Sequence, residues 1–352
     1  MKSIKDIPDK MKVLNLKGVG ELVYEEKDTP KVAPGEVLVN IKASGICSSD
    51  IERVFLTGTY HFPTIPGHEF AGQIVAVGEG VDEALLGRKA SVFPLLPCRE
   101  CHSCKVEDYP LCSNYNYFGS RCDGGFAEYL AVPVWNLVLQ DDAVDYKVAA
   151  LAEPAAVGLH ASNIGGVKAG DKVAVIGTGT IGILIGAFCK LKGAEVYICG
   201  RRKESMKFAE SFGFRTFSVN EMEAKAKEYT NGLGMDVVLE AVGTNEALEQ
   251  AILGVKNSGT IVAVGNPKSD LHIEKGIYWR ILRRQITLKG TWNSNYKASD
   301  NDWEKVATLM KEGGFPFEKL VTRTYPMSQS EEAFEFLRDK SVSKAKVMFV
   351  NE

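Results

Sequence analysis

The chain has 352 residues, of which 45% are hydrophobic and 25% charged, and its formal net charge is −3. This composition is typical of a soluble globular protein, and the small net charge gives no bulk field for binding nucleic acid or an anionic membrane. No apolar run reaches the roughly 20 residues needed to cross a bilayer, so we expect a cytoplasmic protein of two domains with neither nucleic acid nor membrane as a partner.

The first ten residues, MKSIKDIPDK, are expected to form a loose leader. The N-terminus lacks the apolar stretch of a secretory signal peptide, so we do not expect one. Met11 opens MKVLNL, the first expected strand, and is an alternative start of translation. From there to about residue 150 the chain is predicted to be β-rich, with strands over 35–45, 70–80 and 87–93. Glycine and proline separate these strands, which indicates short turns between them.

Four cysteines follow these strands in one short loop over 98–112, at Cys98, Cys101, Cys104 and Cys112. The spacing C-x2-C-x2-C-x7-C lets the thiolates converge on one ion, and four sulfurs with no open position are typical of structural zinc. An iron–sulfur cluster also accepts four cysteines, so the spacing leaves that alternative open. The chain has eight cysteines and no export signal, which favours metal binding in a reducing compartment over disulfides.

A second set of ligand-type residues is scattered along the chain. Cys47 lies in GICSSD, His68 and Glu69 lie in PGHEF, and Glu153 lies in LAEPA. A thiolate, an imidazole and a carboxylate can form a three-ligand zinc site that leaves one position for a substrate. Each residue alone also has an ordinary structural explanation, since single cysteines and histidines are often core residues.

Beyond Asp171 the pattern changes to strands that alternate with helices. Apolar strands are expected over 171–177, 195–200, 235–243 and 259–265, and helices over 180–193 and 201–213. This alternation predicts a parallel sheet with helices on both faces.

The turn after the first of these strands carries G-T-G-T-I-G, residues 177–182. Gly177 permits a tight turn, Gly179 lets the backbone approach a pyrophosphate, and Gly182 lets the helix pack against the strand. Thr180 and Ile181 open the helix, whose N-terminus stabilises the diphosphate charge. The motif therefore predicts a dinucleotide site, and the alternative is a glycine-rich turn with no ligand.

The end of the second strand indicates which nucleotide binds. An NAD site places an acidic residue there, whereas this chain has Gly200 followed by Arg201 and Arg202. Without the carboxylate, a 2′-phosphate meets no repulsion, and the two guanidinium groups can pair with it. This favours NADP(H) over NAD(H), and the alternative is that both arginines only begin a solvated helix.

Together these motifs resemble one family. G-H-E at 67–69, the four-cysteine loop, E-P at 153–154 and G-T-G-T-I-G are similar in order and spacing to the zinc-dependent medium-chain alcohol and polyol dehydrogenases, over about residues 11–350. The resemblance implies an α/β fold with a GroES-like β-rich catalytic domain over 1–154. It also implies a Rossmann domain with a doubly wound parallel sheet over 155–294 and a return to the catalytic domain over 295–352.

The same resemblance implies two zinc ions per chain, a homodimer or homotetramer, and roles for individual residues. Cys47, His68 and Glu153 would hold a catalytic zinc, and the four-cysteine loop a structural one. Glu69 would ligate weakly or bond to the water at the metal. Ser49 would relay the alcohol's proton, with Asp50 beside the ligands. Glu52 stands near the position of a relay histidine in some alcohol dehydrogenases, so the last proton step stays open.

Three segments indicate the substrate class. PLLPCRECHSC, YFGSRCDGGFAEY and KGTWNSNY are similar to galactitol-1-phosphate 5-dehydrogenases and sorbitol dehydrogenases. This implies oxidation of a polyol or polyol phosphate at a secondary carbinol, with galactitol 1-phosphate going to tagatose 6-phosphate as the leading candidate. Arg121, Trp292 and Tyr296 are candidate substrate contacts. The galactitol-phosphate enzymes carry Asp at the position of Gly200, which argues against NADP(H).

Two alternatives to this function stay open. One is a dehydrogenase of the same family for sorbitol, a butanediol or another secondary alcohol. The other is a non-catalytic cofactor-binding protein.

Overall fold

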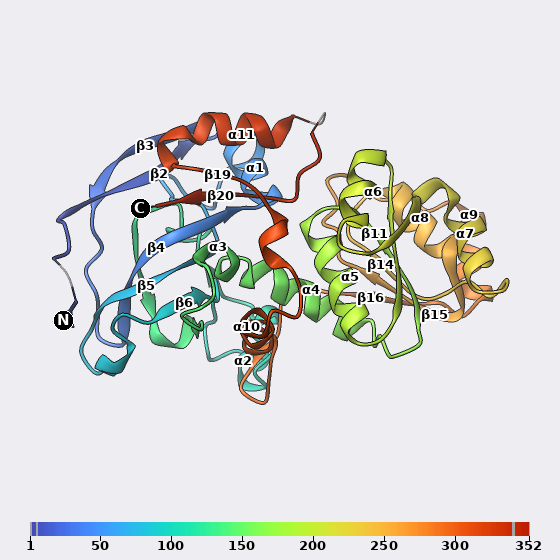
Figure 1. The fold of residues 1–352 in the computed structure, drawn as a ribbon, viewed down its shortest axis with the longest axis horizontal. Helices are drawn as coiled ribbons and strands as arrows, with labels where there is room; N and C mark the ends of the chain where they lie inside the picture. The colour runs from blue at the N-terminus through green and yellow to red at the C-terminus, as the bar shows by residue number, and fades with distance from the viewer. Residues whose placement is uncertain (1, 5, 340–341, 352) are drawn as a thin grey trace. The chain divides into compact units, whose positions relative to one another are not determined.

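The computed structural model describes residues 2–4, 6–339 and 342–351. The chain divides into two compact units, of which the first is Met1–Glu153 with Asn295–Glu352 and the second is Pro154–Ser294 (Figure 1). Among the described residues, no helix combines the length and apolar character required to span a bilayer.

The first unit is built around an eight-stranded sheet that is antiparallel except at one edge pair. Its central strand β4 (Glu36–Ile46) pairs with β5 (Glu69–Val77) and with two other strands. Alternate side chains of β4 enter different cores, because successive residues of a strand point to opposite faces. The remaining strands are β1 (Lys2–Ser3), β6 (Lys89–Val92), β9 (Tyr129–Pro133), β10 (Leu137–Leu139), β19 (Val321–Tyr325) and β20 (Lys346–Val350).

Short elements surround this sheet. The hairpin of β2 (Lys10–Gly18) and β3 (Glu21–Asp28) covers part of it, and α1 (Ser48–Glu52) continues directly into a π-helix over Arg53–Thr57. The other elements are β7 (Leu95–Leu96), α2 (His102–Lys105), β8 (Asn116–Tyr117), α3 (Tyr146–Ala149), β17 (Tyr296–Lys297), β18 (Asp300–Asn301), α10 (Asp302–Glu312), α11 (Ser330–Arg338) and 3-10 turns at Glu83–Leu85, Tyr109–Leu111, Val134–Asn136, Phe317–Leu320 and Met327–Gln329.

The second unit contains a six-stranded parallel sheet in the order β13-β12-β11-β14-β15-β16. Its strands are β11 (Lys172–Ile176), β12 (Glu195–Gly200), β13 (Arg215–Ser218), β14 (Met235–Glu240), β15 (Val255–Ala263) and β16 (Thr287–Gly290). Its helices are α4 (Ala152–Ile164), which begins in the first unit, α5 (Thr180–Leu191), α6 (Lys203–Glu210), α7 (Met222–Tyr229), α8 (Asn245–Gly254) and α9 (Lys275–Arg283), with a 3-10 turn at Val219–Glu221.

Helices cover both faces of this parallel sheet. Helices α7, α8 and α9 share one hydrophobic core with the strands, whereas the buried side of α5 lies outside that core. On the side of α5, Gly186 lets the helix approach Ile198 of β12 closely, since an added Cβ would lie 3.1 Å from its Cδ1. The predicted doubly wound sheet is therefore confirmed.

The N-terminal segment differs from the predicted loose leader. Lys2 and Ser3 form β1 and pair with Val77 and Ala76 of β5, and the amide of Ile4 donates to the carbonyl of Val75 at 3.0 Å. The edge of β5 offers backbone hydrogen bonds that composition alone does not reveal. Met1 lies outside the described residues.

Candidate metal centres and dinucleotide site

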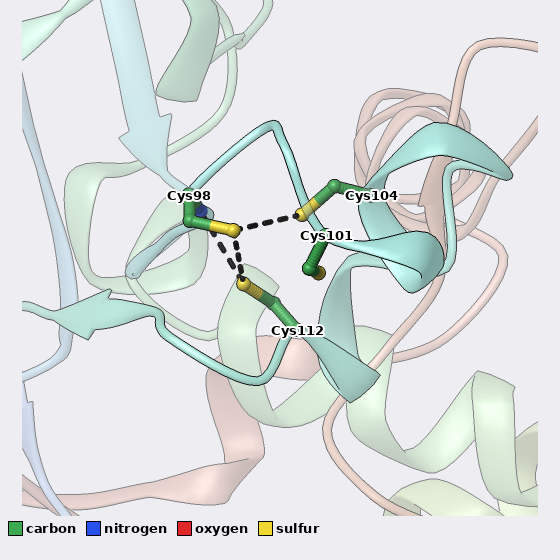
Figure 2. Close-up of side chains that lie close together, drawn as sticks. All are labelled: Cys98, Cys101, Cys104 and Cys112. Atoms are coloured by element: carbon green, nitrogen blue, oxygen red, sulfur yellow. Dashed lines mark hydrogen bonds between the residues drawn. The ribbon is translucent and has the colours of Figure 1, made fainter.

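The four-cysteine loop lies between β7 and β8 of the first unit. Figure 2 shows the four sulfur atoms pointing toward a common centre, and all of them lie within 4.8 Å of one another. Cys98 Sγ lies 3.9 Å from Cys104 Sγ and 3.4 Å from Cys112 Sγ. A tetrahedral ion with zinc–sulfur bonds of about 2.3 Å separates its sulfurs by about 3.8 Å. The thiols therefore fit a single zinc ion.

The pKa values of two of these cysteines shift in opposite directions. Backbone amides of Cys104 and Ser113 lower the pKa of Cys101 to about 6, whereas burial raises the pKa of Cys104 to about 12. Metal binding requires thiolates, so an ion at the centre would stabilise the charged form of Cys104 that burial disfavours.

A second cluster forms where β4 and β5 lie side by side. Ligand atoms of Cys47, His68 and Glu69 lie within 4.8 Å of one another. Cys47 follows the end of β4 and Glu69 opens β5, and the antiparallel register places Gly45 opposite Glu69. A larger residue in place of Gly45 would clash with Glu69, since a Cβ there would lie 2.2 Å from Glu69 Oε2. The register of two strands thus assembles a thiolate, imidazole and carboxylate set.

Glu153 lies at the start of α4 and is buried. Its Oε1 accepts a hydrogen bond of 3.4 Å from the hydroxyl of Tyr117, whose ring centroid lies 5.9 Å from that of His68. Burial raises the pKa of Glu153 to about 7, against the opposing effect of His68. The group whose ligand atoms lie within 4.8 Å of one another thus contains Glu69 and not Glu153. Glu153 is a second carboxylate near this group, through its bond to Tyr117.

The Asp50 carboxylate lies close to the His68 ring, whose Nδ1 makes no hydrogen bond among the described residues. The Asp50 side chain is fully buried, and its Oδ1 lies 3.4 Å from His68 Nδ1. Its Oδ2 accepts the amide of Cys47 at 2.9 Å, and its Oδ1 accepts Arg53 Nη1 at 3.0 Å. Burial alone would raise the pKa of Asp50, but His68, Arg53 and the Cys47 amide hold it below its ordinary value. Such a carboxylate fixes the orientation of a ligating imidazole.

Ser49, the predicted proton relay, accepts a hydrogen bond of 2.9 Å from Arg53 Nη1. Sequence analysis missed Arg53. Its position four residues after Ser49 and three after Asp50 is the spacing at which helical side chains meet, so the signal was available.

Lys346 is a further site residue that the sequence did not indicate. It opens β20 and donates to both carboxylate oxygens of Glu69, at 2.6 and 2.5 Å, in a buried ion pair. Burial lowers the pKa of Lys346, but Glu69, Cys47 and Glu153 together outweigh that effect and raise it. The two residues are 277 positions apart, so no local pattern indicated the pair.

The charges around this cluster fit a divalent cation. Buried cations and anions require partners, because their desolvation is costly. Four groups that can carry negative charge lie here with two permanent cations, namely Cys47, Asp50, Glu69 and Glu153 with Arg53 and Lys346. Burial lowers the pKa of His68, but Asp50 and Cys47 together raise it well above its ordinary value, so the cluster favours positive charge, which a zinc ion would supply.

The glycine motif of the second unit forms the predicted turn between β11 and α5. Gly177 has φ of 128°, a conformation that other residues rarely adopt. A Cβ on Gly182 would lie 2.0 Å from the carbonyl oxygen of Gly177. Gly179 caps α5, and Thr180 and Ile181 form its first turn. The loop therefore has little side-chain bulk, and an anion can reach the backbone amides at the start of the helix.

Gly200 ends β12 and lies against this same loop. A Cβ there would lie 2.6 Å from Cγ2 of Thr178, inside the glycine motif. Arg201 and Arg202 follow it and are exposed, immediately before α6.

The three candidate substrate contacts have different surroundings. The Arg121 guanidinium carbon lies 4.2 Å from the Tyr60 ring centroid and 4.3 Å from that of Tyr115. Trp292 belongs to the second unit and is 56% exposed. Tyr296 is buried and stacks on Phe93 at 4.2 Å, with its hydroxyl donating to backbone carbonyls. The Tyr296 side chain is therefore held in an aromatic cluster and offers little surface to a substrate.

Comparison with known proteins identifies two domain types. Residues 33–142 match the alcohol dehydrogenase GroES-like domain, and residues 180–312 match the zinc-binding dehydrogenase domain. Galactitol 1-phosphate 5-dehydrogenase of Escherichia coli K12 is 35% identical over 292 residues, which cover 81% of this chain and 84% of that enzyme. A sorbitol dehydrogenase of Halalkalibacterium halodurans is 31% identical over 341 residues, 93% of this chain and 95% of that enzyme.

A solved structure of a zinc-binding dehydrogenase from Sinorhizobium meliloti, bound to NADP, has a TM-score of 0.90 and 27% identity. The match covers 98% of this chain and 100% of the solved chain. These matches confirm the predicted combination of a GroES-like domain with a Rossmann domain.

Proposed function

Because the chain belongs to the zinc-dependent medium-chain alcohol and polyol dehydrogenase family, we propose that it oxidises a secondary carbinol of a polyol phosphate. The leading substrate is galactitol 1-phosphate, which would become tagatose 6-phosphate. The observation that carries this proposal is the convergence of Cys47, His68 and Glu69 beside Ser49 and Asp50.

We assign the residues of this cluster as follows. Cys47 and His68 hold a catalytic zinc, with Glu69 or Glu153 as the oxygen ligand, while Asp50 orients His68. The four-cysteine loop holds a second, structural zinc. A zinc ion in the cluster supplies a Lewis acid that polarises the carbinol oxygen. A nicotinamide nucleotide at the glycine motif supplies the hydride acceptor.

The protein's own groups then manage the proton. Ser49 Oγ accepts the hydroxyl proton of the carbinol and passes its own proton outward. Tyr117 holds Glu153 through its hydroxyl, and the pKa of Tyr117 is raised well above its ordinary value by burial and by Glu153. Tyr117 therefore stays a hydrogen-bond donor to Glu153.

Arg121 is the proposed phosphate contact. Its Nη1 donates to the Tyr115 carbonyl and its Nη2 to the Tyr60 hydroxyl, both at 3.1 Å. A guanidinium has five N–H groups, so the two bonds that the described residues make leave donors for a dianion. The two tyrosine rings hold the group in place, which reduces the entropy lost on binding.

We expect Arg121→Ala to raise KM for galactitol 1-phosphate about 10- to 100-fold, because each charge-assisted bond contributes roughly 1.5–3 kcal/mol. KM for free galactitol should change little. Arg88→Ala, at an exposed arginine of the same unit, is the control. Steady-state kinetics with free and phosphorylated polyols measures the difference.

An equal effect on both substrates would exclude Arg121 as the phosphate contact. If the wild-type enzyme prefers sorbitol or a short diol, the phosphate assignment itself is wrong, and the zinc polyol dehydrogenase class still holds.

We propose NADP(H) as the preferred nucleotide, on the basis of Gly200, Arg201 and Arg202. Gly200→Asp is expected to shift kcat/KM toward NAD by about 10- to 100-fold, since the carboxylate would repel the 2′-phosphate. The new Cβ also presses on Thr178, so Gly200→Ala is the matched control for steric effects alone. A higher kcat/KM with NAD than with NADP in the wild-type enzyme would contradict the proposal.

We also propose a homodimer or homotetramer in the cytoplasm, where the eight free cysteines fit a reducing environment. Strand β16 is an edge strand whose residues are all exposed, including Leu288, and nearby Trp279 and Leu282 of α9 are 43% and 58% exposed. Unpaired edges with apolar side chains favour association. Light scattering should give a molecular mass that is a multiple of 38.5 kDa. Leu288→Lys should lower this mass, whereas Leu191→Lys, at an exposed leucine used as the control, should leave it unchanged.

A further inference from the structure

Arg53 joins two groups that the proposed function uses separately. It follows α1 directly and opens the π-helix over Arg53–Thr57. Its single nitrogen Nη1 donates to Ser49 Oγ at 2.9 Å and to Asp50 Oδ1 at 3.0 Å. Asp50 is fully buried, whereas the Arg53 side chain is 21% exposed. The guanidinium therefore spans from the buried carboxylate to the serine hydroxyl.

We propose that Arg53 is a positioning residue that orients the Ser49 hydroxyl to accept the proton of the substrate carbinol. This inference rests on the proposed function, because it assigns Arg53 an effect only through the relay at Ser49. It does not make Arg53 a proton acceptor, since a guanidinium stays protonated in proteins.

The argument follows from the hydrogen-bonding capacity of a serine hydroxyl. The oxygen has two lone pairs and one proton to donate. The permanent donor at Arg53 Nη1 occupies one lone pair. The other lone pair can then accept a proton from the carbinol, and the serine's own O–H points to the next acceptor. Arg53 thus gives the hydroxyl one direction for receiving and another for releasing a proton.

The proton and electron changes balance across this step. The carbinol O–H bond breaks as its proton forms a bond to Ser49 Oγ, and the original serine proton leaves to water, so the serine is regenerated. The carbinol carbon would lose a hydride, with its two electrons, as its carbon–oxygen bond becomes a carbonyl, and a nicotinamide nucleotide held at the glycine motif would be the acceptor that is reduced. Arg53 neither gains nor loses a proton.

The second bond of Nη1 explains why an arginine is required. Asp50 is itself fixed by the Cys47 amide, so it anchors the guanidinium to a rigid part of the protein. A planar guanidinium presents its donors in fixed directions, whereas the lysine ammonium is a compact charge on a flexible stem. Lysine at this position would keep the positive charge and lose the defined geometry.

A different role for Arg53 would act through Asp50 alone. In that case Arg53 would stabilise the buried carboxylate that orients His68, and its loss would weaken the metal site rather than the relay. The two roles predict different results in a double-mutant cycle with Ser49, because coupling reveals which residue a side chain acts through.

The experiment compares Arg53→Met, Ser49→Ala and the double variant, with Arg53→Lys and with Arg88→Met as a control at an exposed arginine. Arg53→Met should lower kcat roughly 10- to 100-fold with KM nearly unchanged, as expected when a proton-transfer group loses its orientation. The solvent deuterium isotope effect on kcat should rise, because proton transfer becomes slower. In the Ser49→Ala background, Arg53→Met should cause no further loss, and Arg53→Lys should not restore kcat.

Two readouts do not depend on turnover. Zinc content should be unchanged in Arg53→Met, and a crystal structure of that variant should show Ser49 distributed over several rotamers while His68 stays in place. Loss of zinc, or an equal loss of kcat in both Ser49 backgrounds, would overturn the inference in favour of a structural role through Asp50. If Ser49→Ala retains wild-type kcat, the relay in the proposed function is wrong. If Ser49→Ala is inactive and Arg53→Met is fully active, only the inference about Arg53 is wrong.

Discussion

Replacing His68 by alanine is expected to abolish turnover while the protein stays folded. His68 is 5% exposed, its ring nitrogen lies within 4.8 Å of the ligand atoms of Cys47 and Glu69, and alanine would remove this imidazole ligand from the cluster. Lewis-acid stabilisation contributes several kcal/mol to such reactions, so kcat should fall at least about a thousandfold. Asp50 keeps its bonds to Arg53 and to the Cys47 amide, which limits the cost to folding.

The measurements are kcat, zinc content and the melting temperature. Zinc content should fall by one ion per chain, because the four-cysteine loop stays intact. His272→Ala, at an exposed histidine, is the matched control and should match the wild type. A His68→Ala enzyme that keeps its turnover after losing this zinc would contradict the assignment of the cluster as the catalytic centre.

Replacing Cys104 by alanine is expected to damage the fold rather than the chemistry. Cys104 is 6% exposed, and a structural zinc contributes about 10–16 kcal/mol of binding energy in small zinc-binding peptides. The loop also carries Tyr109, whose ring centroid lies 5.0 Å from that of Trp135. The guanidinium carbon of Arg99, in the same loop, lies 4.6 Å from the Trp135 ring centroid. Loss of the ion should therefore loosen the loop and this aromatic contact together.

We expect a lower yield of folded Cys104→Ala, a lower melting temperature and the loss of one zinc per chain. Molecules that keep the other zinc should retain much of their activity per catalytic ion. Cys122→Ala is the matched control, since Cys122 is a half-buried thiol outside both metal clusters. An unchanged melting temperature and full zinc content in Cys104→Ala would show that the loop does not depend on a metal.

The local motifs could be read from the sequence because their geometry depends on short stretches of backbone. Fifteen residues contain all four cysteines of the loop, so spacing alone predicts that the sulfurs converge. The turn of G-T-G-T-I-G is equally local, since Gly182 and Gly177 are five residues apart and in direct contact. Arg53 belongs to this group too, because its contact with Ser49 follows from helical periodicity.

The composition of the second metal cluster depended on the tertiary structure. The sequence with its family resemblance named Cys47, His68, Glu69 and Glu153, but the register of β4 and β5 determines that Glu69 lies within ligand distance of Cys47. Tyr296 also depended on the tertiary structure. Its motif suggested a substrate contact, but its side chain stacks on Phe93 in an aromatic cluster.

The sequence by itself thus indicated a β-rich part followed by a parallel α/β sheet, the convergence of the four cysteines and the glycine turn, because each is encoded by periodicity or by neighbours in the chain. Only the tertiary structure revealed that Lys346, 277 residues away, forms a buried ion pair with Glu69. Pairing of β20 with β4 brings the two residues together, and strand pairing at that separation depends on the whole first unit. The charge balance of the candidate catalytic centre is therefore a property of the fold.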